Sequence, residues 1–283
     1  MVGGTTFGIA TFKLSTAAAG TSANVRELRF STVGTDAIES ITVGGVPNVP
    51  VIAGGTTTVS GLNITVSSTG TDVPVTVKYS GFQNSTAGGS LQNSIATVSV
   101  TLGYIEGTSG SGSVITNTTA VSSNNMTLVA SKPTVTVSST QGGTLILGAE
   151  NKIGEFTVAA DANGKVSVAT TTINLAGIGF TGAVFSAARI ADGNTTITSG
   201  TSSVAGTVVT VSFAPGYEIS AGQSKTFSLY ANVAGTATAG VTPYVASSLS
   251  SAGFQWRDVI GGGTQFAGTN IINFPTNSYT TSR

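Results

Sequence analysis

A twelve-residue segment that occurs twice constrains this chain more than any other feature. Gly55–Val66 reads GTTTVSGLNITV and Gly200–Val211 reads GTSSVAGTVVTV, so the two segments match without a gap at an offset of 145 residues. Both combine a glycine-containing turn with apolar residues at every second position, which is typical of a strand with one buried face. The match predicts that one β unit is present twice.

A second pair of segments supports this duplication. Ile9–Leu14 reads IATFKL and Ile153–Val158 reads IGEFTV, at an offset of 144 residues. We therefore expect two domains, residues 1–131 and 132–283, with the boundary close to Ser131-Lys132-Pro133. Each domain would have roughly 140 residues, which is enough to bury its own core.

The composition favours strands throughout. The 38 glycines and the abundant Ser and Thr disfavour long helices, whereas Val, Ile and Thr favour half-buried strands. Many short strands between Gly, Asn and Ser turns predict all-β antiparallel sandwiches. The expected strands are 9–14, 25–30, 38–43, 73–79 and 95–104, then 134–138, 144–147, 153–158, 166–175, 183–190, 225–233 and 241–256. Residues 107–125 are expected to form a long surface loop or a frayed hairpin.

Alternation along these strands also predicts the core. The expected core side chains are Val77, Tyr79, Val98, Val100, Val209, Val211, Phe227 and Leu229.

The residues that are absent exclude several classes of site. The chain has no Cys and no His, which removes thiolate and imidazole ligands, Ser/His and Cys/His nucleophiles, and disulfides. Charged residues make up 8% of the chain and balance to zero, so no basic patch is available for nucleic acid. No apolar run approaches the ~20 residues that cross a bilayer, so we expect no membrane span. The start, MVGGTTFG, shows no export signal, so we expect either a mature or trimmed form or a chain that is not exported by that route.

Carboxylates are the remaining candidates for catalysis. A glycosidase needs two of them at a fixed separation. Glu27 with Glu39, or Glu218 with Asp258, can meet in space, but nothing in the sequence singles out either pair. The glycine runs 142–143 and 261–263 lack the lysine of a phosphate-binding loop. We therefore expect no enzyme.

One segment resembles the opening of a calcium loop. Asp161-Ala162-Asn163-Gly164 has the acid and the glycine, but no bidentate acid stands at the downstream position. A hairpin turn with Asn163-Gly164 at its tip accounts for the same residues. We expect no cofactor and no metal. Calcium held by Glu150, Asp192 or Glu218 stays open as an alternative.

Two further sequence features suggest recognition or modification. Phe254 and Trp256, the only Trp, stand beside an Arg-Asp pair and can form an exposed platform for stacking on a sugar ring. A buried Trp flanked by a surface ion pair is the reading that we favour. Acceptor sequons for N-glycosylation occur at Asn63, Asn84, Asn117, Asn125 and Asn194.

The two repeats differ at their beginnings. Strands 134–138 and 144–147 precede the 153–158 strand, whereas only Met1–Thr6 precedes the matching strand of the first repeat. The first domain therefore lacks an edge strand, and an unpaired edge is a template for a strand from another chain. We expect the tail segment 268–274, or the N-terminal segment 5–14, to complete a sheet in a neighbouring subunit. The alternative is that the tail folds back as the last strand of its own domain. The expected assembly residues are Phe7, Ile9, Phe12, Ile271, Ile272 and Phe274.

Two longer segments resemble a known group of proteins. These are IGEFTVAADANGKVSVATTTINLAG, which starts at Ile153, and GFQWRDVIGGG followed by NFPTNSYTTSR at the end. They resemble the tandem Ig-like modules of cell-surface and S-layer-like proteins from candidate-phyla-radiation bacteria, mainly over residues 150–283. A more distant similarity is to extracellular filament subunits that join by strand donation. The resemblance implies two tandem Ig-like antiparallel sandwiches with an extracellular, structural or adhesive role.

These observations together predict a structural subunit of an extracellular filament or surface layer. Copies of the chain would assemble through β-strand edges, with donor-strand complementation as one mode, and a near-neutral surface does little to oppose self-association. A monomeric adhesin or carbohydrate-binding module that contacts cell-surface glycans is the alternative. A virion surface protein is a third reading.

Overall fold

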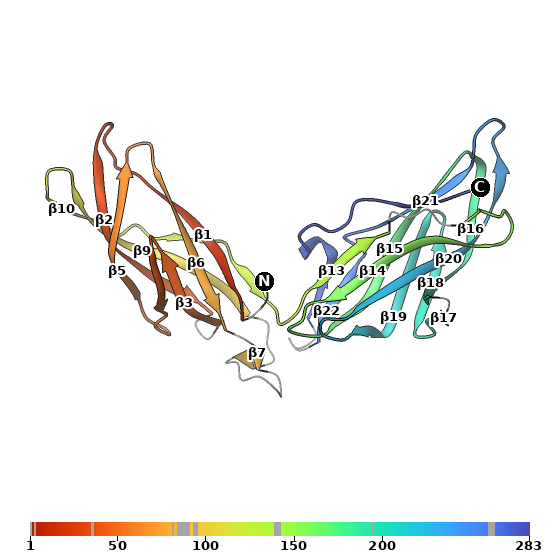
Figure 1. Ribbon diagram of the computed structural model, residues 1–283, viewed down its shortest axis with the longest axis horizontal. Helices are drawn as coiled ribbons and strands as arrows, with labels where there is room; N and C mark the ends of the chain where they lie inside the picture. Colours follow the sequence, from red (N-terminus) through yellow and green to blue (C-terminus); the bar gives the residue numbers. More distant parts are fainter. Residues whose placement is uncertain are drawn as a thin grey trace. The chain divides into compact units, whose positions relative to one another are not determined.

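The computed structural model describes residues 2, 4–34, 37–80, 82–83, 91–92, 96–138, 143–193, 195–259 and 264–283. The chain divides into two compact units, Met1–Ala130 (unit 1) and Ser131–Arg283 (unit 2). The described residues form strands and no α-helix, with a short 3-10 helix, η2 (Gly268–Asn270), near the end. Each unit is a sandwich of two antiparallel sheets, so the predicted all-β sandwich fold is confirmed (Figure 1).

Unit 1 has one sheet in the order β1-β6-β3-β4 and one in the order β9-β2-β5. The first sheet consists of β1 (Thr6–Leu14), β6 (Thr71–Tyr79), β3 (Ile38–Val43) and β4 (Val46–Pro50). The second consists of β9 (Ala96–Ser109), β2 (Ser22–Val33) and β5 (Thr57–Ser67). Three short strands pair with the outer side of β9: β10 (Val114–Asn117), β11 (Val121–Ser122) and β12 (Met126–Leu128). A short parallel pair, β7 (Phe82–Gln83) and β8 (Leu91–Gln92), stands apart.

Unit 2 repeats this plan with additional strands at its edges. Its first sheet consists of β13 (Pro133–Val137), β14 (Glu150–Ala160), β20 (Ser224–Ala237), β16 (Phe180–Asp192) and β17 (Thr195–Thr196), in that order. Its second sheet consists of β18 (Gly200–Ala205), β19 (Val208–Ile219), β15 (Val166–Ile178), β21 (Tyr244–Leu249) and β24 (Tyr279–Ser282). β22 (Gln255–Asp258) pairs with both β15 and β23 (Gln265–Ala267).

The predicted core is confirmed in both units. All eight expected side chains are buried, from Val77 and Tyr79 in unit 1 to Phe227 and Leu229 in unit 2. Phe227 is the centre of an aromatic cluster. Its ring stacks on Phe156 at a centroid distance of 5.1 Å and meets the edge of Tyr217 at 5.1 Å.

A shared bulge confirms the duplication at the level of single residues. The pairing of β1 with β6 shifts between Gly8 and Ala10, and the pairing of β14 with β20 shifts between Lys152 and Gly154. The extra residues are therefore Ile9 and Ile153, which are 144 positions apart and both buried. β1 and β14 are equivalent strands, and this offset relates them residue by residue.

The segment that first indicated the repeat has two different structures. In unit 2, residues 200–211 form the β18–β19 hairpin, which turns at Gly206 (φ 61°). In unit 1 the matching Gly61 (φ 78°) lies within β5, at a bulge opposite β2. Gly61 and Gly206 both have left-handed backbone conformations, which glycine adopts readily. The same glycine of the repeat therefore forms a bulge in unit 1 and a turn in unit 2.

For residues 107–125 a loop or a frayed hairpin is expected, and the hairpin is present, because β10 pairs antiparallel with the end of β9, while β11 pairs with an earlier part of β9. Two predicted strands differ from the structure. The expected strand 241–256 splits into β21 and β22, and the turn between them includes Gly253, where an added Cβ would meet the Thr172 side chain at 2.3 Å. Residues 144–147 form no strand, because the Asn151 side chain bonds both backbone groups of Ile146.

Candidate functional site

The outer edge of β1 is the clearest difference between the two units. β14, the equivalent strand of unit 2, has β20 on one side and β13 on the other. β1 pairs with β6 alone and ends its sheet, and no other strand in the described part of the chain lies beside it. The position that β13 occupies in unit 2 is therefore vacant in unit 1, as the comparison of the two repeats predicts.

Two residues of β1 direct their backbone groups toward this vacant position. Thr11 lies opposite Pro74, which has no N–H and cannot form a hydrogen-bonded pair. In an antiparallel ladder, a residue at a non-hydrogen-bonded position, such as Thr11, directs its N–H and C=O away from the neighbouring strand. Every second residue has this orientation, so the N–H and C=O of Lys13 also face away from β6. The equivalent residue of unit 2 has this orientation. The backbone carbonyl of Glu155, which corresponds to Thr11, accepts a hydrogen bond from the N–H of Ser138, the residue after β13 (3.1 Å).

A groove runs along this edge between the two sheets of unit 1. Its volume is about 930 Å³, and residues 9–17 form one wall. Its apolar lining comes from both sheets and from the short strands beside β9: Ile9, Phe12, Leu14, Val25, Val66, Leu102, Ile105, Ile115, Val121 and Met126. Lys13 is the charged residue among the described residues that line it. An elongated, nearly uncharged groove beside free backbone donors and acceptors suits an extended peptide.

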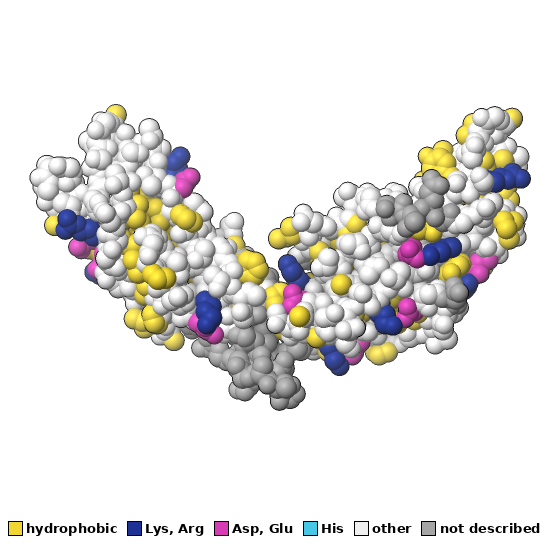
Figure 2. All heavy atoms as spheres, in the orientation of Figure 1, with side chains coloured by type: hydrophobic (Ala, Val, Ile, Leu, Met, Phe, Trp, Pro, Cys, Tyr) yellow, Lys and Arg dark blue, Asp and Glu magenta, His cyan; other side chains and the backbone are white. Residues whose placement is uncertain are grey.

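Apolar side chains continue from the groove onto the surface. On β10, Val114 is 71% exposed and Ile115 is 41% exposed, and Val121 on β11 is 52% exposed. Phe7, at the start of β1, is 40% exposed. Figure 2 shows apolar side chains at the surface of unit 1 on the face in view. Exposed apolar residues that line an open groove, as Ile115 and Val121 do, are typical of a contact surface.

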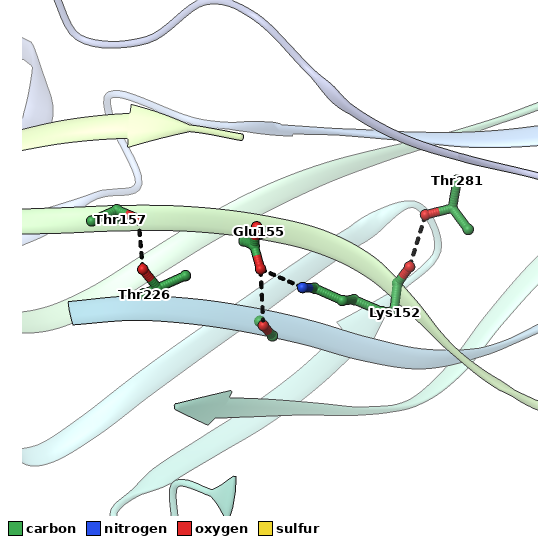
Figure 3. A network of polar contacts seen from close by, with 6 residues as sticks. Lys152, Glu155, Thr157, Thr226 and Thr281 are labelled. Atoms are coloured by element: carbon green, nitrogen blue, oxygen red, sulfur yellow. Dashed lines mark hydrogen bonds and ion pairs between the residues drawn. The ribbon is translucent and has the colours of Figure 1, made fainter. Parts of the chain in front are cut away.

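The corresponding flank of unit 2 is closed. The Thr281 hydroxyl on β24 donates to the Lys152 carbonyl on β14 (2.7 Å) (Figure 3). The N–H of Leu145 donates to the carbonyl of Ser282 (2.8 Å). The Asn277 amide donates to the Val137 carbonyl of β13 (3.1 Å). The final strand and its flanking turn therefore join the two sheets of unit 2 at the place where unit 1 has its groove.

The two flanks also differ in their charged side chains. In unit 2 the Lys152 ammonium pairs with Glu155, which also accepts a hydrogen bond from Ser228 (3.5 Å) (Figure 3). Partial burial disfavours the charged form of Lys152, but the hydrogen bond and the charge of Glu155 outweigh it and raise the pKa of this ammonium. The equivalents of this pair in unit 1 are Gly8 and Thr11, so the open edge has no such ion pair.

The predicted assembly residues at the N-terminal end divide into two groups. Phe7 is exposed on β1 beside the open edge. Ile9 and Phe12 are buried in the core of unit 1, where the Phe12 ring lies 6.1 Å from that of Phe30. Their side chains line the inner wall of the groove and do not form an outer surface. Whether any of the three takes part in assembly stays a prediction.

The predicted strand at residues 268–274 is wrong. The segment begins with η2 and continues without strand structure, and Asn273 has a left-handed backbone (φ 62°). A side chain at position 268 would meet the Ser251 carbonyl at 2.7 Å, so Gly268 permits a tight approach that coils the chain. The Phe274 ring packs 5.5 Å from that of Phe254, Ile271 is half-buried, and Ile272 is 84% exposed.

The tail returns to its own unit. β24 pairs with β21, so the tail ends as the last strand of its own domain with residues 279–282, as the alternative expects. Whether Ile271, Ile272 or Phe274 contacts a neighbouring copy stays a prediction.

The aromatic platform is also contradicted. Phe254 and Trp256 are buried, and the Trp256 ring lies 4.8 Å from that of Phe266 on β23. The favoured reading of a buried Trp is therefore confirmed. Asp258 is buried as well, where a surface position was expected.

Three of the five sequons lie among the described residues. Asn63 is exposed on β5 and accepts a hydrogen bond from the Asn24 amide. Asn117 is exposed at the end of β10, where it accepts from the Thr119 N–H (2.7 Å), and Asn125 is exposed between β11 and β12. Asn84 and Asn194 lie outside the described residues. Glycosylation stays a prediction at all five.

The acids that were candidates for calcium each pair with a base. Arg189 binds Glu150 through two hydrogen bonds of 2.6 and 2.7 Å, and the Arg189 hydrogen bond lowers the pKa of that carboxyl. Asp192 pairs with Lys225 (2.7 Å), and Glu218 lies 3.9 Å from Lys165. Within the described ranges, no three acids gather as a metal site would require. Calcium binding stays untested.

The predicted turn at Asn163-Gly164 joins β14 to β15. The N–H of Gly164 donates to the Asp161 carbonyl (3.3 Å), and the Asp161 carboxylate accepts from the Asn163 N–H (3.0 Å). Asp161 therefore organises the turn itself.

The surface charges are distributed in small groups. Charged side chains on the face shown in Figure 2 lie mostly beside a partner of opposite sign. That face presents no broad patch of one sign. In the described part of the chain, no helix has the length and apolarity that would take it through a lipid bilayer.

Comparisons with known proteins find only distant structural likeness. No family model matches the sequence, and no curated protein matches it. A similar solved structure is the C-terminal domain of the AgI/II polypeptide BspA of Streptococcus agalactiae, with a TM-score of 0.28 and 10% identity over 100% of this chain and 94% of that chain. The C-terminal domain of the antigen I/II-family protein AspA of Streptococcus pyogenes has a TM-score of 0.29 and 9% identity, with the same coverage.

A third similar structure is BcpA, the major pilin subunit of Bacillus cereus. It has a TM-score of 0.31 and 9% identity over 91% of this chain and 63% of that chain. By their descriptions, these three structures are the C-terminal domains of two AgI/II (antigen I/II) proteins and a major pilin subunit. All three scores lie below 0.5, so the function we propose rests on the open edge of β1 and on the groove beside it.

Proposed function

We propose that this chain is a structural subunit of an extracellular filament or surface layer, and that copies of it associate by strand addition at the open edge of β1. The observation that carries the proposal is the vacant position beside β1, which β13 fills in unit 2. An unpaired edge with free N–H and C=O groups gains a full set of hydrogen bonds when a strand is added.

The surroundings of the edge support association between proteins. The groove supplies apolar area that an added strand would cover, and the partly exposed Ile115 and Val121 belong to its lining. A contact between this edge and a different surface of the next copy is heterologous, and such contacts produce open chains when the rotation does not close a ring. The balanced charge of the chain adds little repulsion between copies.

The extracellular location is part of the same proposal. It is supported by the resemblance of residues 150–283 to S-layer-like modules. The alternative of a carbohydrate-binding module loses its sequence basis, because Phe254 and Trp256 are buried.

The test is the size of the particles that the purified chain forms. We expect concentration-dependent growth in sedimentation velocity at micromolar concentration, and fibres or sheets in negative-stain electron microscopy. A monodisperse monomer across this range would contradict the proposal and would favour the alternative of a monomeric binding module.

A further inference from the structure

Unit 2 contains the strand that unit 1 lacks, and this strand shows what such an edge accepts. β13 reads PTVTV and pairs antiparallel with β14, with Val135 opposite Val158 and Val137 opposite Phe156. Pro133 and Val135 are buried, whereas Thr134 and Thr136 are exposed. The strand thus directs branched apolar side chains inward at every second position and neutral polar ones outward.

The shared bulge at Ile9 and Ile153 transfers this register to unit 1. With the offset of 144 residues, Phe156 corresponds to Phe12, Thr157 to Lys13 and Val158 to Leu14. A strand placed as β13 is placed would therefore lie opposite residues 12–16. That stretch falls within residues 9–17, which form the wall of the groove. The register and the groove are independent observations, and they agree on the same part of β1.

The groove also limits the chemistry of its occupant. Its described lining combines apolar side chains with neutral Ser, Thr and Asn, contains no acid that would hold a cation, and has Lys13 as its one charged residue. Thr136 faces Thr157 in unit 2, so the residue that faces Lys13 must be neutral or acidic, because a base there would repel the ammonium.

On the basis of the proposed function, we infer that the open edge of unit 1 binds an extended, uncharged strand of another copy, with branched apolar residues at alternate positions. This strand runs antiparallel to β1 in the register of β13. Its inward residues lie opposite Phe12 and Leu14, and a small polar or acidic residue lies opposite Lys13.

A cross-linking experiment tests this register directly, because the chain has no cysteine. The probe is a synthetic peptide with the sequence of residues 131–138, SKPTVTVS, carrying T136C or, as the matched control, T134C. The full-length chain carries K13C. Residues directly opposite in a ladder are about 5.5 Å apart at Cα, within the reach of a disulfide. A shift of two residues increases the separation to about 7–8 Å, beyond that reach.

We expect the T136C peptide to form the mixed disulfide at least about tenfold faster than the T134C peptide, since only the former pairs in register. A full-length chain with T157C provides a second control. β13 already covers that position, so this chain should react with neither peptide while its circular dichroism stays that of the parent. Equal rates for the two peptides, or no reaction at K13C, would overturn the inference.

The outcomes separate this inference from the proposed function. Cross-linking in register to a chain that stays monomeric would support the register and the chemistry of the bound strand, but would defeat both the polymer and a second copy as the source of that strand. Polymers from a chain that shows no preferred register with the peptide would support the polymer and defeat the inference.

Discussion

A proline at position 13 separates the role of β1 in its own sheet from its role as an open edge. The N–H of Lys13 faces away from β6, so Lys13→Pro removes a donor that unit 1 does not use for its own ladder. The preceding residue, Phe12, is in an extended strand, which is the backbone that a following proline favours. We expect the free energy of unfolding to change by less than about 1 kcal/mol.

The same proline should weaken association strongly. A strand added opposite residues 12–16 would receive one hydrogen bond from the Lys13 N–H, and the proline would leave its carbonyl buried without a donor. An unpaired buried acceptor costs about 1–3 kcal/mol. Since 1.4 kcal/mol is a factor of ten, the dissociation constant between subunits should rise by about 5- to 150-fold.

Sedimentation velocity over a concentration series measures the association, and urea unfolding of the same samples measures the stability. Lys13→Thr is the matched control, because it keeps the N–H and introduces the residue type of the equivalent position, Thr157. We expect it to associate at least as strongly as the parent chain, since a lysine on a free edge opposes pairing. Unchanged association of the proline variant, at unchanged stability, would refute the reasoning.

Three further predictions concern the cores. Phe227→Ala removes the centre of the aromatic cluster and should lower the unfolding free energy of unit 2 by about 3–5 kcal/mol in urea titration; a loss below about 1 kcal/mol would contradict the packing described here. Burial raises the pKa of Tyr79 to about 12, above its unfolded value of about 10. Its contribution to stability is therefore complete below about pH 10 and is lost as the pH rises toward 12. Tyr79→Phe should remove this alkaline loss without weakening unit 1 at pH 7, because the buried hydroxyl has no hydrogen-bond partner among the described residues; equal alkaline unfolding of both proteins would argue against this. Trp256 should resist quenching by acrylamide and keep its emission when oligosaccharides are added, and a saccharide-dependent shift would revive the platform reading.

The sequence predicts those features that depend on local alternation. Val77 and Tyr79, or Phe227 and Leu229, stand at every second position of an apolar run, and such a run has one face to bury wherever its neighbours lie. The edge strand of unit 2 is also visible in the sequence, because residues 134–138 alternate polar and apolar side chains ahead of Ile153. The sandwich fold and this edge strand therefore needed no knowledge of long-range contacts.

The features that the sequence misses depend on contacts between distant residues. The apolar run Ile271–Phe274 has the composition of a strand, but Gly268 packs against Ser251 and the Phe274 ring packs against Phe254, so the chain coils. The groove is a second case, because its far wall consists of β10 to β12. Their pairing with β9 is not apparent in a segment of mostly Ser, Thr and Asn.

The Asn277 amide that covers the Val137 carbonyl has a consequence for the form of any polymer. It occupies an acceptor at the margin of β13, and with β24 it leaves unit 2 without the opening that unit 1 has. Each molecule then offers one open edge, that of β1, for this type of contact, so it can accept a strand from one neighbour. Growth through this contact gives unbranched threads, and their lateral joining into a sheet would need a second kind of contact.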